Sequence, residues 1–391
     1  MSVFNSLGSN YDLSFALRAL FLNKDVNLNK YLEEKYGGEA ILLFKGREAI
    51  TLALQTLNLP EDSQVAVNGF TCYAVYRAIE EAGCKPVLID IPKDDLNFTR
   101  SDLASNLAKN ADIKAVIVQN TLGFPCDIEE ISKFCKEKKL ILIEDLAYSV
   151  GAKYKNGMEA GRVGDFTMLS FSQDKIIDGI SGGALIIKNF KFQISNFKFT
   201  NPSFGRQLKD RLYPILTWKI RNTYDFGVGK VLHFIFKNLG LLSTLMDNSL
   251  YRLLKLPSFY QALALDSIER LEKDITHRKK IANIYKENLS RKIMFEKLNS
   301  QIDNSSNLRF PIFVNNRETL IKFLKNKKFY ISDIWYDAPI APKRFMKKIN
   351  YNNDCPNAEK ISDVILNLPT HKNISEKQAL YLSDLINKCL K

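Results

Sequence analysis

Short apolar segments alternate with amphipathic segments between about residues 40 and 190. Apolar runs occur at 40–44, 64–67, 86–89, 115–118, 140–143, 166–169 and 184–187. Strands that are apolar throughout are buried on both faces, as in the parallel sheets of α/β proteins. Helical periodicity separates several of these runs, at 46–57, 74–82 and 128–138. The pattern predicts an α/β fold with a doubly wound, mostly parallel sheet.

The pattern changes after residue 188. Residues 190–255 are rich in Phe, Tyr, Lys and Leu, and we interpret them as an insertion or lid of irregular and helical pieces. A long helical pattern at 260–289 predicts one bridging helix. Beyond it we expect strands at 309–314 and 329–331 and helices at 318–325 and 376–389. We therefore expect a large domain over 1–256 and a smaller α+β domain over 257–391 that includes the bridging helix.

The composition is that of an ordinary globular protein, with 46% hydrophobic and 25% charged residues among 391. No apolar stretch reaches the roughly 20 residues needed to span a bilayer. The first residues lack a basic start followed by an apolar run, so we expect a cytoplasmic location. The six cysteines and three histidines are scattered. Their spacing predicts no metal site and fits reduced thiols.

The net charge of +13 is concentrated in one region. Residues 206–255 hold nine basic and three acidic residues. This surplus favours an anionic partner, either a phosphorylated substrate, an acidic lipid or a nucleic acid. Nucleic acid ranks last because no nucleic-acid motif accompanies the charge. Peripheral contact with an anionic membrane around 218–221 and 233–237 is a less favoured alternative to covering the active site or a dimer interface.

Two residues near the ends of predicted strands carry the candidate chemistry. Asp145 follows the apolar run 140–143, and Lys175 lies 30 positions later, before Gly182-Gly183. A lysine in this place could form a Schiff base with the aldehyde of pyridoxal phosphate. The aspartate could keep the pyridine nitrogen of that cofactor protonated. The structural alternatives are a solvated surface lysine and a helix-capping carboxylate.

A phosphate could be held beside these residues. Ser170 ends the apolar run before Lys175 and can donate a hydrogen bond to a phosphate. Gly46-Arg47 stands between a predicted strand and a predicted helix, where free backbone N–H groups can bind a phosphate. The chain has neither a Walker sequence nor a Gly-x-Gly-x-x-Gly motif, so nucleotide-triphosphate and dinucleotide sites lose support.

Taken together, these residues resemble the nucleotide-sugar aminotransferase family (DegT/StrS type) of fold-type I pyridoxal phosphate enzymes. The resemblance covers roughly residues 40–190 and 257–391. The stretches that carry it are 46–54, 70–75, 83–90, 144–148, 170–175 with Gly182-Gly183, 355–360 and 368–369.

The resemblance implies a role for each candidate residue. Lys175 would be the Schiff-base lysine and proton shuttle, and Asp145 would pair with the pyridine nitrogen. Ser170 and the backbone at Gly46 and Arg47 would bind the cofactor phosphate. The implied substrates are glutamate as amino donor and a keto sugar on a nucleoside diphosphate as acceptor. The implied assembly is a homodimer with active sites at the subunit interface.

Three stretches depart from the family pattern. Cys72 stands where an aromatic residue usually covers the cofactor ring, and Phe70 or Tyr73 could take that role. Tyr148 replaces the usual Gln or His near the ring hydroxyl, and it can still form a hydrogen bond. Residues 255–260 lack the Gly-aromatic-Asn-x-Arg segment whose Asn reaches the partner's cofactor.

We therefore predict a pyridoxal phosphate-dependent aminotransferase that moves an amino group from glutamate to a keto sugar, nucleotide-linked, in surface polysaccharide or amino-sugar biosynthesis. One alternative is a related pyridoxal phosphate enzyme acting on another ketone. The other is a non-catalytic protein that binds a membrane surface. Residues 335–340 are expected to form a loop near the domain junction, where they either touch the sugar or pack. The predicted catalytic residue is Lys175, and the predicted cofactor-binding residues are Gly46, Arg47, Cys72, Tyr73, Asp145, Tyr148 and Ser170.

Overall fold

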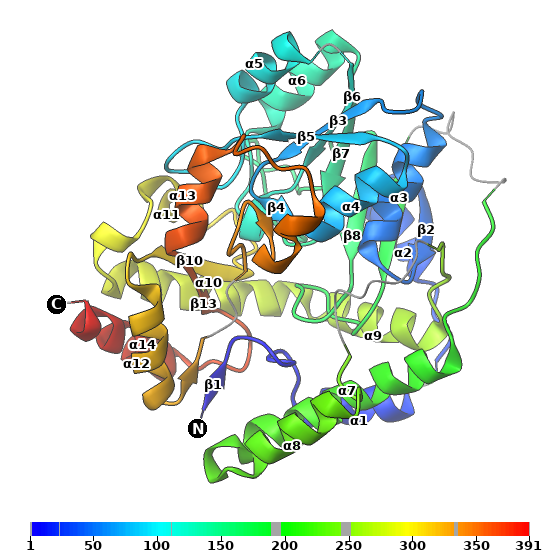
Figure 1. Cartoon of the computed structure of the whole chain (residues 1–391). Helices are drawn as coiled ribbons and strands as arrows, with labels where there is room; N and C mark the ends of the chain where they lie inside the picture. The colour runs from blue at the N-terminus through cyan, green and yellow to red at the C-terminus, as the bar shows by residue number, and fades with distance from the viewer. Residues whose placement is uncertain are drawn as a thin grey trace.

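A central sheet surrounded by helices forms the body of the molecule (Figure 1). The computed structural model describes residues 2–22, 24–110, 112–188, 197–243, 252–331 and 335–390. Two parts of the predicted insertion, 190–196 and 244–251, lie outside the described residues.

The sheet has seven strands in the order β2-β9-β8-β7-β6-β3-β5. Strand β9 runs antiparallel to both of its neighbours, and the other neighbouring pairs are parallel. This arrangement confirms the predicted mostly parallel α/β sheet. The strands are β2 (Glu39–Leu43), β3 (Gln64–Asn68), β5 (Lys85–Ile89), β6 (Ile113–Val118), β7 (Ile141–Asp145), β8 (Phe166–Ser170) and β9 (Gly183–Ile187).

Both faces of the sheet are buried, because alternate residues of one strand enter different cores. In β3, Val65 and Val67 pack in one core and Ala66 packs in the other. The first core also holds apolar residues of α3 (Gly46–Thr56) and α4 (Tyr73–Glu81). The opposite core is covered by α2 (Leu28–Tyr36), α5 (Arg100–Lys109), α6 (Ile128–Lys138) and α9 (Ser258–Glu269).

A separate core lies toward the C-terminus. It is built from apolar residues of α10 (Leu271–Asn288), α12 (Arg317–Asn326), α14 (Glu376–Cys389) and the antiparallel pair β10 (Arg309–Phe313) and β13 (Ile365–Pro369). Val3 of β1 (Val3–Phe4) joins this core, and β1 pairs in parallel with β11 (Phe329–Tyr330). The N-terminal strand thus packs with the C-terminal part of the chain (Figure 1). The domain boundary at 256/257 stays a prediction.

The expectation of one helix over 260–289 is wrong, because α9 and α10 are separate helices. Arg270 between them has φ −100° and ψ 2°, outside the helical region. The break lets the two helices serve different cores: Leu263 of α9 packs under the large sheet, while Ile281 of α10 packs in the C-terminal core.

Three helices form a layer along the lower edge of the molecule in Figure 1. They are α1 (Leu13–Phe21), α7 (Phe204–Thr223) and α8 (Val228–Asn238), and α7 packs against both others. Shorter elements complete the described fold: β4 (Thr71–Cys72), α11 (Glu296–Ser300), β12 (Ile340–Ala341) and α13 (Pro356–Val364). No helix of the described residues is both long enough and apolar enough to cross a bilayer.

Candidate active site

The predicted site residues meet at the carboxyl edge of the central sheet. Asp145 ends β7, Ser170 ends β8, and Lys175 lies in the loop between β8 and β9. Parallel strands direct their carboxyl ends to one edge of a sheet, which is where ligands bind in open α/β folds. All three residues line a cavity of about 800 Å³, together with Gly46, Arg47, Cys72 and Tyr148.

Lys175 points its amine at two aromatic rings. Its Nζ lies 3.8 Å from the ring centroid of Tyr148 and 5.0 Å from that of Trp335. Burial lowers the pKa of Lys175 to about 8, although Cys72 and Asp145 favour the charged form. An amine with this pKa is about half neutral at pH 8, and only the neutral form is nucleophilic.

Asp145 is 1% exposed and lies in a hydrogen-bonded pocket. Its Oδ1 accepts a bond from the backbone N–H of Ala147 at 2.8 Å, and its Oδ2 accepts one from Gln119 Nε2 at 3.2 Å. Burial raises the pKa of Asp145 to about 6, and these two hydrogen bonds and the charge of Lys175 act in the opposite direction. A cationic ligand group beside Asp145 would therefore be favoured, because it would stabilise the carboxylate.

Glycine backbone lies unusually close to Ser170 at the start of α3. A Cβ atom added to Gly46 would lie 2.9 Å from Ser170 Cβ. A Cβ atom added to Gly183 would lie 2.6 Å from both Gly46 Cα and Gly46 N. Only glycine permits this close approach of three backbone segments. The approach places the first turn of α3 beside Ser170 at one wall of the cavity.

Both aromatic residues that were candidates for covering a cofactor ring stack on other aromatic side chains. Phe70 stacks on Tyr336 at 4.7 Å, and Tyr73 stacks on Phe345 at 4.5 Å. Among the described residues that line the cavity, Cys72 is present and Phe70 and Tyr73 are not. The structure thus brings Cys72 to the site and directs the Tyr73 ring away from it.

Sequence reasoning left Trp335 open and missed Gln119 and Arg309. The structure places Trp335 in the cavity wall, where the Arg309 guanidinium lies 4.9 Å from its ring centroid. Arg309 is 1% exposed and donates a hydrogen bond to the Asn5 carbonyl at 2.8 Å. Gln119 follows the apolar run 115–118, so its place after a buried strand was a usable signal. The sequence around Arg309 gave no signal of a role in the site, because an arginine at the start of a strand is usually exposed.

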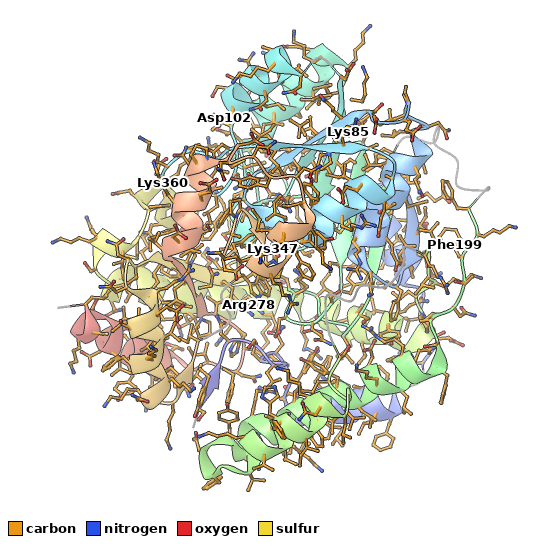
Figure 2. All side chains as sticks on the ribbon, viewed as in Figure 1. Lys85, Asp102, Phe199, Arg278, Lys347 and Lys360 are labelled. Carbon is orange, nitrogen blue, oxygen red and sulfur yellow. The ribbon has the colours of Figure 1, made fainter. Side chains whose placement is uncertain are left out.

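The N-terminal segment holds the loop that carries Lys175. Asn10 Nδ2 donates to the Lys175 carbonyl at 3.3 Å and to Asp178 Oδ2 at 3.2 Å. Ser9 Oγ donates to Asp174 Oδ1 at 3.0 Å, in the same loop. Arg278, which lies in the interior of the molecule (Figure 2), donates to Asn10 Oδ1 at 3.2 Å. The lysine loop is therefore fixed by residues far away in the sequence.

The sequence profile of the DegT/DnrJ/EryC1/StrS aminotransferase family matches residues 25–387. The chain belongs to this family. The predicted resemblance is thereby confirmed, as is the prediction of a pyridoxal phosphate-dependent aminotransferase, since pyridoxal phosphate is the cofactor of this family. The N-terminal segment that contacts the lysine loop lies before the matched residues.

Named relatives span nearly the whole chain. GDP-perosamine synthase of Escherichia coli O157:H7 is 24% identical over 92% of this chain and 88% of its own length. A UDP-4-amino-4,6-dideoxy-N-acetyl-beta-L-altrosamine transaminase of Campylobacter jejuni (strain 81-176) is 25% identical over 89% and 84%. The solved structure of a putative sugar aminotransferase from Streptococcus pneumoniae, in its PMP form, covers 97% of this chain and 96% of its own, with a TM-score of 0.69 and 17% identity. That likeness confirms the fold.

The residues of the cavity fit the family's cofactor on two observations of this structure. Gly46 packs so closely against β8 that a side chain there would collide with Ser170, and Gly46, Arg47 and Ser170 together line the cavity. Gln119 and Asp145 are buried at the carboxyl ends of the neighbouring strands β6 and β7, and Gln119 Oε1 has no hydrogen-bond partner among the described atoms. A phosphate at the first place and a protonated ring nitrogen near the second would satisfy these groups.

Replacing Asn10 by alanine tests whether the N-terminal segment positions Lys175. We expect Asn10→Ala to lower kcat by up to about 10²-fold, because small misplacements of a reacting group cost that much. Unfolding free energy should fall by about 1–3 kcal/mol, because Arg278 and Asp178 lose a buried partner. Steady-state kinetics and urea unfolding measure the two effects. Asn288→Ala is the control, since Asn288 forms its bond on the exposed side of α10. A variant with reduced stability and unchanged kcat would show that Asn10 has only a structural role.

Proposed function

We propose that the protein transfers an amino group from glutamate to a keto sugar carried by a nucleoside diphosphate, in the synthesis of amino sugars or surface polysaccharide. The observation that carries this proposal is the placement of Lys175 and Asp145 in one cavity at the carboxyl edge of the sheet. Names of relatives give further support, because the enzymes from E. coli and C. jejuni are named for GDP- and UDP-linked sugars.

The charge of the cavity supports anionic substrates. Basic residues from separate elements line it, including Lys322 and Lys325 of α12, Arg344 and Arg47. Among the described residues that line the cavity, the only carboxylates are Asp145 and Asp174. Glutamate and a nucleoside diphosphate both carry net negative charge, so a cavity of this sign would concentrate them. The volume of about 800 Å³ lies in the usual range for small-molecule sites.

Each residue has a task that follows from its surroundings. Pyridoxal phosphate, when bound, supplies an aldehyde that condenses with amines and a ring that accepts electrons. Lys175 Nζ would take a proton from the substrate carbon and return it, which its pKa of about 8 suits. Asp145 would hold the proton on the ring nitrogen. Ser170 Oγ and the N–H groups of the first turn of α3 would bind the phosphate.

Aromatic residues would shield the reacting atoms from water. The rings of Tyr148 and Trp335 lie beside Lys175 Nζ, and all three residues line the cavity. Water exclusion strengthens electrostatic interactions within a site. The cysteine at position 72 leaves one wall of the cavity with a small side chain in place of a ring.

The proposal also covers the assembly of the protein, its location and the alternative substrate class. A homodimer and a cytoplasmic location are implied by the resemblance to the family. Action on a ketone other than a nucleotide-linked sugar remains the second candidate substrate class. The non-catalytic alternative is set aside, because the chain belongs to an aminotransferase family.

Absorbance spectra of the protein loaded with pyridoxal phosphate test the proposal in two stages. Glutamate should remove the visible band of the lysine-bound cofactor and release 2-oxoglutarate. Keto sugars linked to GDP or to UDP should then restore the band and yield the amino sugar, detected by mass spectrometry. Loss of the band without its return by either sugar, but with return by a simple ketone, would replace the proposed acceptor. An unchanged spectrum with glutamate would contradict the proposed donor.

A further inference from the structure

Helix α8 presents large apolar side chains to solvent. Val231, Phe234 and Leu239 are 58%, 69% and 67% exposed, and Phe226 just before the helix is 83% exposed. Val228 and Ile235 are also exposed. Scattered single apolar residues are normal on a surface, whereas a cluster on one short helix indicates an interaction site.

The exposed residues share one side of α8. Val228, Val231 and Ile235 follow at spacings of three and four, Phe234 comes three positions after Val231, and Leu239, which caps the helix, comes four positions after Ile235, so these residues form one stripe. The opposite side rests on α7 and its C-terminal turn through Gly229, where an added Cβ would lie 2.2 Å from the Ile220 carbonyl oxygen. This close contact fixes which side of α8 packs, and it leaves the apolar stripe facing outward.

The charge of this region selects an anionic partner. Residues 204–239 contain seven basic and two acidic residues. Asp210 is fully buried and accepts a hydrogen bond from Tyr260. Asp225 accepts a hydrogen bond from the Ser2 hydroxyl and forms an ion pair with Lys328. The two lysines of α8, Lys230 and Lys237, are exposed, and α8 itself has no acidic residue.

We propose that the exposed stripe of α8, with Phe226 before it, binds the surface of an anionic phospholipid membrane. The helix would lie in the plane of the interface, with its apolar residues among the acyl chains and its lysines near the lipid phosphates. An 11-residue helix is too short to span a bilayer, so this contact is peripheral.

The structure argues against a second copy of this chain as the occupant. A two-fold contact would place the same surface on both sides, so the positively charged surface that carries Lys230 and Lys237 would meet a second positively charged surface. Like charges that meet in an interface are unfavourable, and α8 offers no carboxylate to offset them.

Membrane binding at α8 would place the cavity beside the lipid surface. His233 of α8 and Tyr224 just before the helix line the cavity that holds Lys175. The neighbouring helices carry further exposed apolar side chains, namely Phe21 of α1 and Phe204 of α7, which are 78% and 79% exposed. Docking would thus bring the catalytic cavity close to the membrane without using any residue predicted to hold the cofactor.

Vesicle sedimentation of the 391-residue chain tests the proposal. We expect wild type to sediment with vesicles of equal parts phosphatidylglycerol and phosphatidylcholine, and to remain in solution with pure phosphatidylcholine. Salt should weaken the binding, because it screens the lysines. Lys230→Glu/Lys237→Glu should weaken the partition at least about ten-fold, because each lysine near an anionic surface contributes about 1 kcal/mol. Phe234→Ser/Ile235→Ser should weaken it as well. The control is Leu380→Ser/Tyr381→Ser, which removes two exposed apolar residues from α14.

Several outcomes would overturn the proposal. Wild type that stays in solution with phosphatidylglycerol vesicles contradicts it, as does equal loss of binding in the control variant. The molecular mass measured by light scattering tests the alternative that a second copy of this chain covers the stripe. A lower oligomeric mass in Phe234→Ser/Ile235→Ser, with vesicle binding unchanged, would assign the stripe to a second copy. Thermal unfolding and the glutamate-dependent spectral change should match wild type in every variant, which separates this test from that of the aminotransferase site.

Discussion

Lys175→Ala is expected to abolish amino transfer and leave the fold intact. Proton transfer by a positioned side chain contributes about 10²–10⁴-fold, and this lysine is also the predicted attachment point of the cofactor. The variant should lack the visible band of the lysine-bound cofactor, and kcat should fall by at least that factor. Removing a partly buried amine whose pKa is lowered by burial should not destabilise the protein. Absorbance spectra and a coupled assay for 2-oxoglutarate measure the loss.

A lysine elsewhere on the surface provides the matched control. Lys360 lies on α13 and is exposed at the periphery of the molecule (Figure 2), so Lys360→Ala should retain the band and full activity. In wild type, the rate of reconstitution with pyridoxal phosphate should rise with pH through about 8, as the Lys175 amine loses its proton. Residual activity of Lys175→Ala above about 1% of wild type would assign the proton transfer to another group.

The central sheet could be predicted from the sequence because each strand is a short apolar run with its own boundaries. The same runs located Asp145 and Ser170 at strand ends, and parallel topology then brought them to one edge. In each case the prediction used only residues that are neighbours in the sequence. A glycine beside a strand marked the start of α3 for the same reason.

Contacts between segments distant in sequence could not be predicted. The hydrogen bond from Asn10 to the Lys175 carbonyl joins residues 165 positions apart, and no periodicity encodes it. The ring of Tyr73 faces Phe345 because β4 pairs with β12, a pairing of two-residue strands with no sequence pattern. The break at Arg270 was hidden as well, since no Gly or Pro marks it; beyond it, α10 passes from the large core at Leu271 to the C-terminal core at Ile281.

Asp145→Asn should uncouple stability from activity. Asparagine keeps the shape of the side chain, and its amide can still accept the bond from Ala147 N–H. It cannot carry the negative charge that would hold the proton on the cofactor ring. Loss of a preorganised charge of this kind lowers kcat by about 10²–10³-fold, which steady-state kinetics would measure. Glu129→Gln, on the exposed first turn of α6, is the control and should leave kcat unchanged.

The same substitution should stabilise the protein without cofactor at neutral pH. The pKa of Asp145 is raised to about 6 by burial, above its ordinary value of 3.8, so the folded state binds more protons than the unfolded state between these values. Stability from this group is therefore greatest below about pH 4 and is lost as the pH rises to about 6. Two pH units correspond to roughly 3 kcal/mol, and Asp145→Asn removes this penalty at pH 7. Urea unfolding of the two proteins at pH 5 and pH 7 measures it.

The affinity for the cofactor should also depend on the ionisation of Asp145. Binding to wild type should tighten as the pH rises through about 6, because the Asp145 carboxylate forms and can pair with a protonated ring nitrogen. The phosphate of the cofactor also titrates near pH 6, so the informative quantity is the difference in log Kd between wild type and Asp145→Asn at each pH. If the difference in log Kd grows with pH and Asp145→Asn is more stable at pH 7, then the charge of Asp145 lowers the stability of the fold but serves cofactor binding and the reaction. A difference that stays flat, or a variant that loses stability at pH 7, would mean that Asp145 serves the fold through its hydrogen bonds alone.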